Sequence, residues 1–595
     1  MSWTASAGVT VYAVFRNTTD DIGSASEIGT TESTSFSDDT VLAGVTYYYW
    51  VTAENDCGSS TSDPATFTAC CEGWRAGPLN EGGAGVTSVN AMTTLGSRVV
   101  AGGAFDHPTG DPQAANNIVA YNGLLLSRLG LGMDGPVFAL KSFTHPSGDH
   151  ELIGGGEFTS AGGITADFIA RWVEDPLGFP PAQWAPMGSG FNSSVFAIER
   201  FNNATIAAGQ FDLSGGTAVN RIARWNEETR TWQPMGAGAG GGMNGSVRAL
   251  KAYSLPSPPL GRIQLVAGGS YTTAGGAAAN RIASWTDSTI APGSPAWTAM
   301  GAGFDGTVLA IERHAGSTYA GGDFTASGAT TLNRIARWVP SSSSWVPVGN
   351  GTGFNGTVSA LKSSGANLYA AGSFTTVDGV TARRIARWNG SDWESMQGDP
   401  NAEVTALALY NNELHAGGSF DTLNNETLNS PGWARYLETG VPWIAQQPLP
   451  QTVNCGDEAR FSIEPAQGYD GLSYEWRKDN VPLAPGPTGT GSTIVFGESD
   501  VVVQNPGPAD AGAYHCVLAN GCGSATSLSA TLTVTGCPGD CDEDGDVDWN
   551  DHADFASCLR GPFGDVDLGC ECSDFDGDND VDLLDFAEFQ LLFMD

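Results

Sequence analysis

The sequence predicts a mainly β protein: a seven-bladed β-propeller flanked by β-sandwich domains, with a small α-helical module at the C-terminus. Three observations predict this fold class. A four-segment pattern recurs seven times between residues 73 and 440, the segments on either side alternate apolar and polar residues, and two acidic loops near the end each lead into a helical segment. With 595 residues, 80 Gly and only 15% charged residues, the chain suits several ordered, turn-rich domains.

The charge of the chain limits its partners. The formal net charge is −39, which disfavours nucleic acid and anionic membranes as partners because like charges repel. No run of 18 or more apolar residues occurs, so we expect no membrane span. Residues 537–595 hold 16 Asp and 3 Glu against one Arg, a charge density typical of a solvated tail or of a cation site.

The central repeat predicts the propeller. Each copy opens with Val-x-Ala, continues with a glycine-rich segment such as AGGDF, then a segment such as NRIARW, and ends with a segment such as W-x-P-M-G. Four short β segments at a spacing of 46 to 61 residues are typical of one propeller blade. The opening valines are Val89, Val137, Val195, Val247, Val308, Val358 and Val404.

The two ends of the repeat region complement each other. The seventh copy lacks a fourth segment after Tyr436, whereas residues 74–79 form an isolated fourth segment before the first copy. We therefore expect 74–79 to complete the last blade, which removes an open sheet edge. The copies resemble kelch-type blades, and more closely the Gly-Gly-x-Phe-Thr propeller repeats of bacterial surface proteins, a resemblance that indicates fold rather than activity.

Residues 1–70 read as strands separated by turns, and GVTYYYWVTAENDCGSSTS from Gly44 resembles the last strands of a fibronectin type III domain. The resemblance makes Trp3 the core tryptophan and implies that the first strand is missing, so we expect the chain to be truncated at its N-terminus. No signal peptide is visible in its first residues. Cysteines confined to the outer modules nevertheless indicate an oxidising compartment, and we expect an extracellular or cell-surface protein.

Residues 443–536 carry Trp476 and the pattern Asp-x-Gly-x-Tyr-x-Cys ending at Cys516, which resembles strand F of bacterial immunoglobulin-like domains. Ile463 stands where that family has its strand-B cysteine, which puts the usual bridge to Cys516 in doubt. The preferred pairing is Cys455 with Cys522, with Cys516 as a buried thiol, although sequence alone does not settle connectivity.

Two acidic 12-residue loops lie in residues 537–595. Carboxylates at positions 1, 3, 5, 9 and 12 suit a hard cation that takes six to eight oxygen ligands, position 7 offers its backbone carbonyl, and Val547 and Val581 supply an apolar position 8. We therefore expect two Ca²⁺ ions; Mg²⁺, which keeps its waters, fits less well. The candidate ligand residues are Asp540, Asp542, Asp544, Asp546, Asp548 and Asp551 in the first loop, and Asp574, Asp576, Asp578, Asp580, Asp582 and Asp585 in the second.

With Asp at position 12 and a helix after each loop, this segment resembles a dockerin type I module, whose helix faces near positions 10 and 11 bind cohesin domains. Here those positions hold Trp549-Asn550 and Leu583-Leu584, a departure that puts standard cohesin pairing in doubt. A disordered acidic tail is the alternative. We expect Cys558 to pair with Cys570 or Cys572; a zinc site is the alternative use of these cysteines.

The repeat region offers no catalytic constellation. It has no cysteine between residues 72 and 454, its histidines (107, 145, 150, 314 and 415) are scattered over four repeats, and its acidic pairs lie in turns. Four residues after the opening valines the charge alternates, with lysine at 141, 251 and 362 and glutamate at 199 and 312. These positions favour ion pairs between neighbouring blades; the alternative is a polar ligand-binding mouth.

The sequence thus predicts an exported, non-catalytic binding or scaffold protein in four modules: 1–70, 73–440, 443–536 and 537–595. We expect the propeller to display a recognition face and the C-terminal module to dock or anchor the chain to a cohesin-like or cell-envelope protein in the presence of Ca²⁺. The alternative is a carbohydrate-binding or polysaccharide-degrading component that carries a dockerin, with extracellular polysaccharide as its partner.

Overall fold

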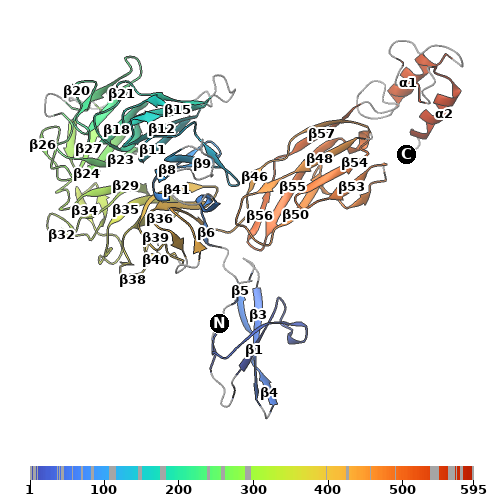
Figure 1. Ribbon diagram of the computed structural model, residues 1–595, viewed down its shortest axis with the longest axis horizontal. Coiled ribbons are helices and arrows are strands. Elements are labelled where there is room, and N and C mark those ends of the chain that lie inside the picture. The colour runs from blue at the N-terminus through green and yellow to red at the C-terminus, as the bar shows by residue number, and fades with distance from the viewer. Residues whose placement is uncertain are drawn as a thin grey trace. The chain divides into compact units, whose positions relative to one another are not determined.

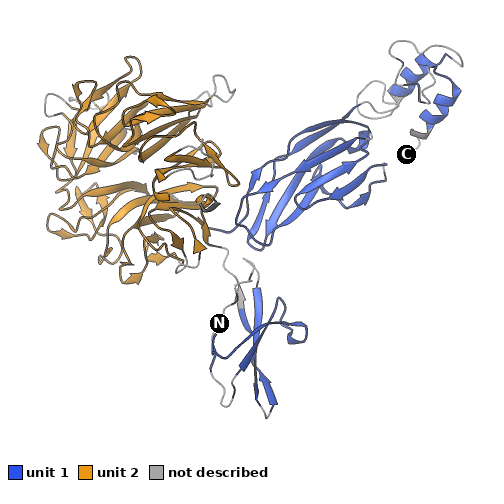
Figure 2. Ribbon diagram, in the orientation of Figure 1, with its two compact units in different colours: residues 1–71, 439–595 blue, residues 72–438 orange. Residues whose placement is uncertain are grey.

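The computed structural model divides the chain into two compact units, residues 72–438 and residues 1–71 with 439–595 (Figures 1 and 2). No helix in the described part of the chain is long and apolar enough to cross a membrane. The structure describes residues 3–4, 9, 11–36, 38, 41, 46–55, 58–68, 72–81, 86–105, 116–144, 150–174, 182–236, 241–255, 262–287, 296–396, 398–423, 428–455, 457–489, 491–535, 549–560, 570, 573–575 and 580–592.

The described residues of unit 72–438 form seven four-stranded antiparallel sheets, each spanning one copy of the sequence repeat. The first six contain, in chain order, β7 (Val86–Leu95), β8 (Arg98–Phe105), β9 (Ile118–Tyr121) and β10 (Leu126–Arg128); β11 (Val137–Thr144), β12 (His150–Gly156), β15 (Ile169–Glu174) and β16 (Gln183–Pro186); β17 (Val195–Phe201), β18 (Ala204–Gly209), β21 (Ile222–Asn226) and β22 (Thr231–Pro234); β23 (Val247–Leu255), β24 (Arg262–Gly269), β27 (Ile282–Thr286) and β28 (Ala296–Ala299); β29 (Val308–His314), β30 (Ser317–Gly322), β33 (Ile335–Val339) and β34 (Ser344–Val346); and β35 (Val358–Ser364), β36 (Asn367–Gly372), β39 (Ile385–Trp388) and β40 (Trp393–Ser395). The seventh sheet joins β41 (Val404–Tyr410), β42 (Glu413–Gly418) and β45 (Trp433–Leu437) to β6 (Gly73–Ala76).

The sheets follow one another in a ring, as Figure 1 shows. The opening strand of each sheet contacts the opening strand of the next, and β41 of the seventh sheet contacts β7 of the first. Strand β42 of the seventh sheet also lies close to β7, because a Cβ atom added to Gly417 would lie only 2.6 Å from Cγ1 of Val89. The glycine-rich segment of one sheet therefore receives the opening valine of the next sheet.

Strand β6 completes the seventh sheet from the other end of the unit. It pairs with β45 in antiparallel register, with Trp74 opposite Tyr436. The Trp74 indole donates a hydrogen bond to the Met396 carbonyl of the preceding sheet (3.2 Å), just as Trp232 donates to the Met187 carbonyl (3.0 Å). The expected segment 74–79 is a strand only as far as Ala76, because a 3₁₀ turn, η2 (Pro78–Glu81), begins at the following proline.

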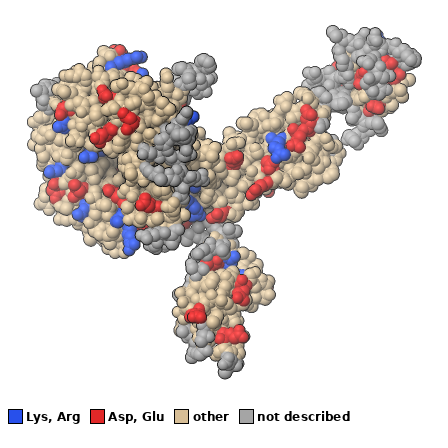
Figure 3. All heavy atoms as spheres, in the orientation of Figure 1, with Lys and Arg blue, Asp and Glu red and all other residues tan. Residues whose placement is uncertain are grey.

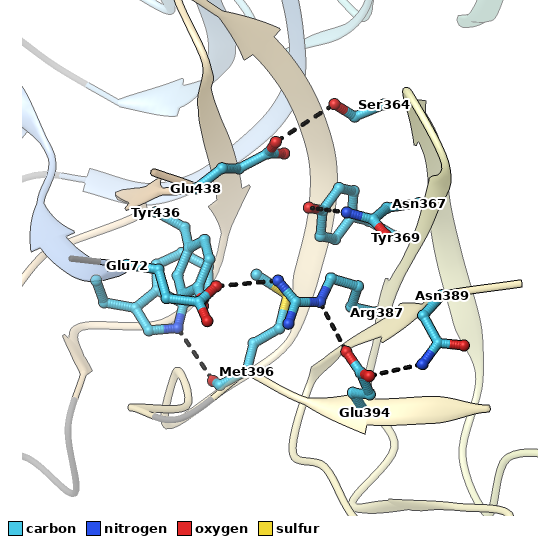
Figure 4. A network of polar contacts seen from close by, with 11 residues as sticks. Glu72, Ser364, Asn367, Tyr369, Arg387, Asn389, Glu394, Met396, Tyr436 and Glu438 are labelled. Atoms are coloured by element: carbon cyan, nitrogen blue, oxygen red, sulfur yellow. Dashed lines mark hydrogen bonds and ion pairs between the residues drawn. The ribbon is translucent and has the colours of Figure 1, made fainter. Parts of the chain in front are cut away.

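A polar network joins this segment to the neighbouring sheet (Figure 4). The Glu72 carboxylate lies 3.0 Å from Nη1 of Arg387 and accepts a hydrogen bond from the Tyr436 hydroxyl, while Arg387 Nε pairs with Glu394 at 2.9 Å. Burial opposes the charge on Arg387, but the hydrogen bonds to Glu394 and Glu72 leave its pKa above the ordinary value. The network anchors the first residues of the unit to its sixth sheet.

Local features of the repeat explain its sequence. Each opening strand has a β-bulge at its Val-x-Ala segment, for example between Val137 and Ala139, which turns the strand locally. The second glycine of the glycine-rich segment lies against backbone: a Cβ on Gly103 would be 2.0 Å from the Ser88 carbonyl oxygen. Short hairpins not expected from the sequence connect the second and third strands of six sheets; they are β13 and β14 (Ser160–Ala161, Ile164–Thr165), β19 and β20 (Leu213–Ser214, Thr217–Ala218), β25 and β26 (Thr273–Ala274, Ala277–Ala278), β31 and β32 (Ala326–Ser327, Thr330–Thr331), β37 and β38 (Thr376–Val377, Val380–Thr381), and β43 and β44 (Thr422–Leu423, Leu428–Asn429).

The N-terminal residues form one five-stranded sheet in the part that the structure describes, where two facing sheets were expected. Trp3 packs against its small apolar core and meets Tyr12 edge to face at 5.4 Å, as expected of a core tryptophan. The elements are β1 (Val11–Asn17), η1 (Ile22–Ser24), β2 (Ser26–Thr31), β3 (Thr46–Asn55), β4 (Gly58–Thr61) and β5 (Ala65–Thr68).

Residues 444–535 form two larger sheets around one apolar core, with a two-stranded sheet beside them. Trp476, Tyr514 and Cys516 are buried in that core, and the Tyr514 hydroxyl donates to the Asp510 carbonyl, the bond of a tyrosine corner. The elements are β46 (Ile444–Gln446), β47 (Gln451–Asn454), β48 (Glu458–Ser462), β49 (Glu464–Pro465), β50 (Ser473–Lys478), β51 (Val481–Pro482), β52 (Gly486–Pro487), β53 (Thr493–Phe496), β54 (Asp500–Gln504), η3 (Pro508–Asp510), β55 (Gly512–Asn520), β56 (Gly523–Thr526) and β57 (Ala530–Thr535).

The expected Cys455–Cys522 bridge is wrong. The Cys455 amide donates to the Thr535 carbonyl at the end of β57, beyond the point where Leu532 pairs with Gly512. Cys522 follows the opposite end of β55, roughly 25 Å or more away along the strand, whereas a disulfide needs its Cα atoms within about 7 Å. Each of the two cysteines is in a disulfide, and Cys516 is a buried free thiol, as expected.

The C-terminal module contains helices α1 (Trp549–Cys558) and α2 (Leu583–Leu592), each beginning a few residues earlier than the sequence indicated. Phe555, Val581 and Phe589 form a small core between them. A disulfide joins Cys558 to Cys570, which confirms one of the two expected pairings. The buried Val581 is the expected apolar position 8 of the second loop.

Candidate functional site

The second acidic loop brings three carboxylates together. Oxygen atoms of Asp580, Asp582 and Asp585 all lie within 4.8 Å of one another. Asp580 and Asp585 are buried, and Asp582 is half-buried. Among the residues that the structure describes, this is the one group of three or more acidic, histidine or cysteine side chains close enough to share a metal ion.

Asp585 organises the second loop. One of its carboxylate oxygens accepts a hydrogen bond from the Phe575 amide at 2.7 Å and the other accepts one from the Asp582 amide at 2.8 Å. The side chain thereby holds the start of the loop near its end. It lies in the first turn of α2, where the helix dipole stabilises a negatively charged side chain.

Asp551 is the counterpart of Asp585 in the first loop. It is the third residue of α1, as Asp585 is of α2, and both side chains are almost fully buried. Buried carboxylates at the twelfth position of both loops are typical of ligands that face inward. Each loop thus ends with a buried aspartate in the first turn of the helix that follows it.

The other predicted ligands are not part of this group of three carboxylates. Asp574 is described and half-buried, and it is not part of the group of three. The remaining predicted ligands lie outside the described residues; they are Asp540, Asp542, Asp544, Asp546, Asp548, Asp576 and Asp578. Val547, Trp549 and Asn550 likewise offer no described side chain.

The donor set fits a hard divalent cation. All its atoms are carboxylate oxygens, the ligands that Ca²⁺ prefers. Residues 537–595 contain one basic residue, Arg560, against 19 acids, and its backbone amide donates to the Val581 carbonyl. Three carboxylates this close repel one another strongly, so a bound cation would remove a large electrostatic cost.

An apolar pair lies beside this group. Leu583 and Leu584, at positions 10 and 11 of the second loop, are 72% and 63% exposed. They begin α2, next to Asp582 and Asp585. Large exposed side chains next to each other in a small module are typical of a contact surface for a partner.

The charged positions of the ring unit form ion pairs between neighbouring sheets. Lys141 Nζ lies 2.7 Å from a Glu199 oxygen, and Lys251 Nζ lies 2.5 Å from a Glu312 oxygen. The expected ion pairs between neighbouring repeats are present at these two places. Lys362 forms no ion pair within the described residues, and burial together with Lys251 and Lys141 lowers its pKa despite the opposing effect of Glu312 and Glu199.

Sequence reasoning missed a buried charged cluster in the seventh sheet. Arg435 Nη1 lies 3.1 Å from a Glu413 oxygen, and both side chains are almost fully buried. The neighbouring His415 accepts a hydrogen bond from the Trp433 indole at 3.0 Å, and burial, reinforced by Arg435, holds its pKa well below the ordinary value. The signal was present in ELHAGG, where His415 takes a position that holds Val, Ile or Tyr in the other six repeats.

Comparisons with known proteins concern the immunoglobulin-like segment. Residues 442–534 match the family model of the Immunoglobulin I-set domain. The solved tandem Ig repeats of Dlar are 20% identical and match 16% of this chain and 48% of theirs, at a TM-score of 0.15. The titin M3 domain is 25% identical and matches 16% of this chain and 95% of its own, at a TM-score of 0.14.

Two facts limit these likenesses to one segment. The chain spans about half the length of the Dlar structure, and a search of curated proteins finds no match. Residues 442–534 therefore form an Ig-like segment of the chain. The ring unit and the acidic loops have to be interpreted from their own geometry.

Proposed function

We propose that the chain is an exported, non-catalytic binding or scaffold protein that docks to a protein partner through a calcium-dependent C-terminal module. In this proposal unit 72–438 is a seven-bladed β-propeller that displays a recognition face. The Ig-like and N-terminal modules serve as spacers. The dockerin-like module binds two Ca²⁺ ions, one in each acidic loop.

The carboxylate group Asp580, Asp582 and Asp585 is the observation that carries the proposal. Its oxygens converge in a module with one basic residue, and Asp551 repeats the position of Asp585 in the other loop. When bound, Ca²⁺ would neutralise these acids and couple the folding of the loops to the metal concentration. Asp574 and the predicted ligands outside the described residues would complete the two sites.

The exposed Leu583-Leu584 pair supports docking to a protein. A partner that covers both side chains would bury apolar surface beside a calcium loop, so that metal binding would control the position of the pair. Leucines in place of small polar residues favour a more apolar partner surface than that of the usual dockerin–cohesin pair. The acidic surface of the chain, part of which Figure 3 shows, argues against polyanionic partners.

The proposal is tested by circular dichroism at 222 nm of the full-length chain as CaCl₂ is added. We expect helical signal to increase with Ca²⁺ but not with the same concentration of MgCl₂. Asp585→Asn should weaken the response by roughly tenfold or more in Ca²⁺ concentration, because it removes a charged ligand. Glu588→Gln, an exposed acid on the same helix, is the matched control and should leave it unchanged. A response equal in wild type and Asp585→Asn would contradict the proposal.

A carbohydrate-binding role is the second candidate function. It is favoured by a groove on the ring unit that three arginines and three glutamates line. A polysaccharide-degrading activity would need two carboxylates flanking a glycosidic bond in one cleft. Hydrolysis assays on the full-length chain would separate binding from degradation.

A further inference from the structure

One groove of the ring unit is lined mainly by polar and charged side chains. It has a volume of about 740 Å³ and lies between the second and third sheets, where β12 and β15 meet β18 and β21. Three arginines (171, 200 and 224) and three glutamates (151, 227 and 228) line it, with amides from Asn202, Asn203, Asn226 and Gln233. This volume is within the range of about 300–1,000 Å³ typical of small-ligand sites.

The charged lining of the groove is not a general feature of the repeat, as a comparison with another pair of neighbouring sheets shows. The seam between the fourth and fifth sheets has the same arginine position, since Arg313 stacks on Tyr253 at 4.4 Å as Arg200 stacks on Phe143 at 5.1 Å. Arg337 likewise stands where the groove has Arg224, but three other charged positions differ: Gln264, Ser284 and Pro340 replace Glu151, Arg171 and Glu227. Packing between repeats therefore does not require the charged lining of the groove.

The groove offers hydrogen-bond donors that the protein leaves unused. The Arg200 guanidinium forms no ion pair among the described residues and lines the groove beside Asn202. Nε of Arg171 is buried and has no hydrogen-bond partner, although Nη1 of the same side chain lies 3.0 Å from Glu227 and 3.7 Å from Glu151. Because that Nε is shielded from solvent, a ligand in the groove would bond instead to the partly exposed guanidinium nitrogens of Arg200 and Arg171.

The charges of the lining select among ligands. The three guanidinium groups are balanced by three carboxylates, so the lining offers a dianion such as phosphate no net electrostatic attraction. Apolar contact in the groove comes mainly from Val173, which is 42% exposed, because Met187 and Trp225 are buried. Hydroxyl groups both donate and accept, and a neutral polyhydroxylated ligand therefore matches alternating carboxylates and guanidinium groups.

We propose that the groove between β12, β15, β18 and β21 binds a neutral oligosaccharide through hydrogen bonds from Arg171 and Arg200 and to Glu228. The inference rests on the proposed binding function of the ring unit and assigns to it a ligand class and a site. Glu227 fixes the position of Arg171, and Asp287 fixes that of Arg224 at 3.1 Å and of Asn202 at 2.8 Å. The walls are thus set before the ligand arrives.

The experiment is isothermal titration calorimetry of the full-length chain with cellobiose, maltose and xylobiose, and with digalacturonate and inorganic phosphate as charged probes. We expect at least one neutral disaccharide to bind and the two charged probes to bind more weakly. Arg200→Ala should weaken binding by roughly 10- to 100-fold, the value of a hydrogen bond to a charged group. Arg313→Ala removes the equivalent stacked arginine of the other seam and should leave binding unchanged.

Glu228→Gln serves as a second variant, because it changes an exposed side chain of the groove and should also weaken binding. Thermal unfolding of each variant shows whether the fold is intact. Failure of all three neutral disaccharides to bind, or equal losses in Arg200→Ala and Arg313→Ala, would overturn the inference. Neither result would bear on the calcium response of the C-terminal module, so failure of this site is distinguishable from failure of the proposed function.

Discussion

The buried Glu413–Arg435 pair gives the sharpest prediction for stability. Glu413→Gln keeps the shape of the side chain but leaves the Arg435 charge without its carboxylate, and both side chains are almost fully buried. His415 does not offset the change, because burial and Arg435 lower its pKa and keep it neutral. Breaking one partner of such a pair costs about 3–5 kcal/mol.

This cost converts into a measurable shift. A unit the size of residues 72–438 has an unfolding entropy of about 0.8 kcal/mol per kelvin, so Glu413→Gln should lower the melting temperature by about 4–6 °C. The assay is differential scanning calorimetry of the full-length chain, which reports the transition of the ring unit. Asp212→Asn removes the partner of Arg221 in an exposed pair of the same unit and should shift the melting temperature by at most about 1 °C.

A second variant separates charge from packing. Glu413→Leu combined with Arg435→Met removes both charges and keeps apolar side chains of similar size. Replacing a buried ion pair in this way is often close to neutral, so most of the stability lost in Glu413→Gln should return. The reasoning fails if Glu413→Gln melts no lower than Asp212→Asn.

The remaining predictions concern charge, pH and thiol chemistry. Lys251→Glu places a second carboxylate beside Glu312 and should destabilise the ring unit by about 2 kcal/mol, measured as a lower urea midpoint; an unchanged midpoint would exclude a structural role for the pair. Burial raises the pKa of Asp399 to about 6 despite the nearby arginines, so the native state favours its protonated form and stability should fall by about 1–2 kcal/mol, after allowance for solvent screening, as pH rises from about 4 to 6. In Asp399→Asn the urea midpoint should depend less on pH over that range. A pH dependence equal to that of the wild type would show that Asp399 is not the group responsible. Burial raises the pKa of the Cys516 thiol to about 12, so it should react with Ellman's reagent only after unfolding; rapid reaction of the native chain would contradict this.

Much of the ring unit was predictable because its signals are local and repeated. The Val-x-Ala segments mark the bulged opening strands, and the isolated segment beginning at Trp74 pairs with β45 as its resemblance to a fourth segment indicated. The short hairpins between second and third strands were missed, since each is only two residues long on either side of a turn. Repetition gave the positions of strands but not these small additions.

Features that depend on distant pairs were harder to predict. Cys455 and Cys522 were the preferred pair once Cys516 was taken as a free thiol, yet the register of β47, β57 and β55 sets them at opposite ends of a sheet. The groove at Arg200 was missed for a related reason, because it is made of departures from the repeat in two neighbouring copies. The acidic loops were recognised from spacing alone, and the structure brings together the three carboxylates that it describes at the end of the second loop.

Calcium stoichiometry tests the central claim most directly. Isothermal titration calorimetry of the full-length chain with CaCl₂ after removal of metal should give two ions per chain, with Asp551→Asn and Asp585→Asn each removing one. Both residues occupy the same buried position at the start of their helices, so the two variants should behave alike. Absence of binding in the wild-type chain, or two bound ions in both variants, would contradict a calcium-dependent docking module.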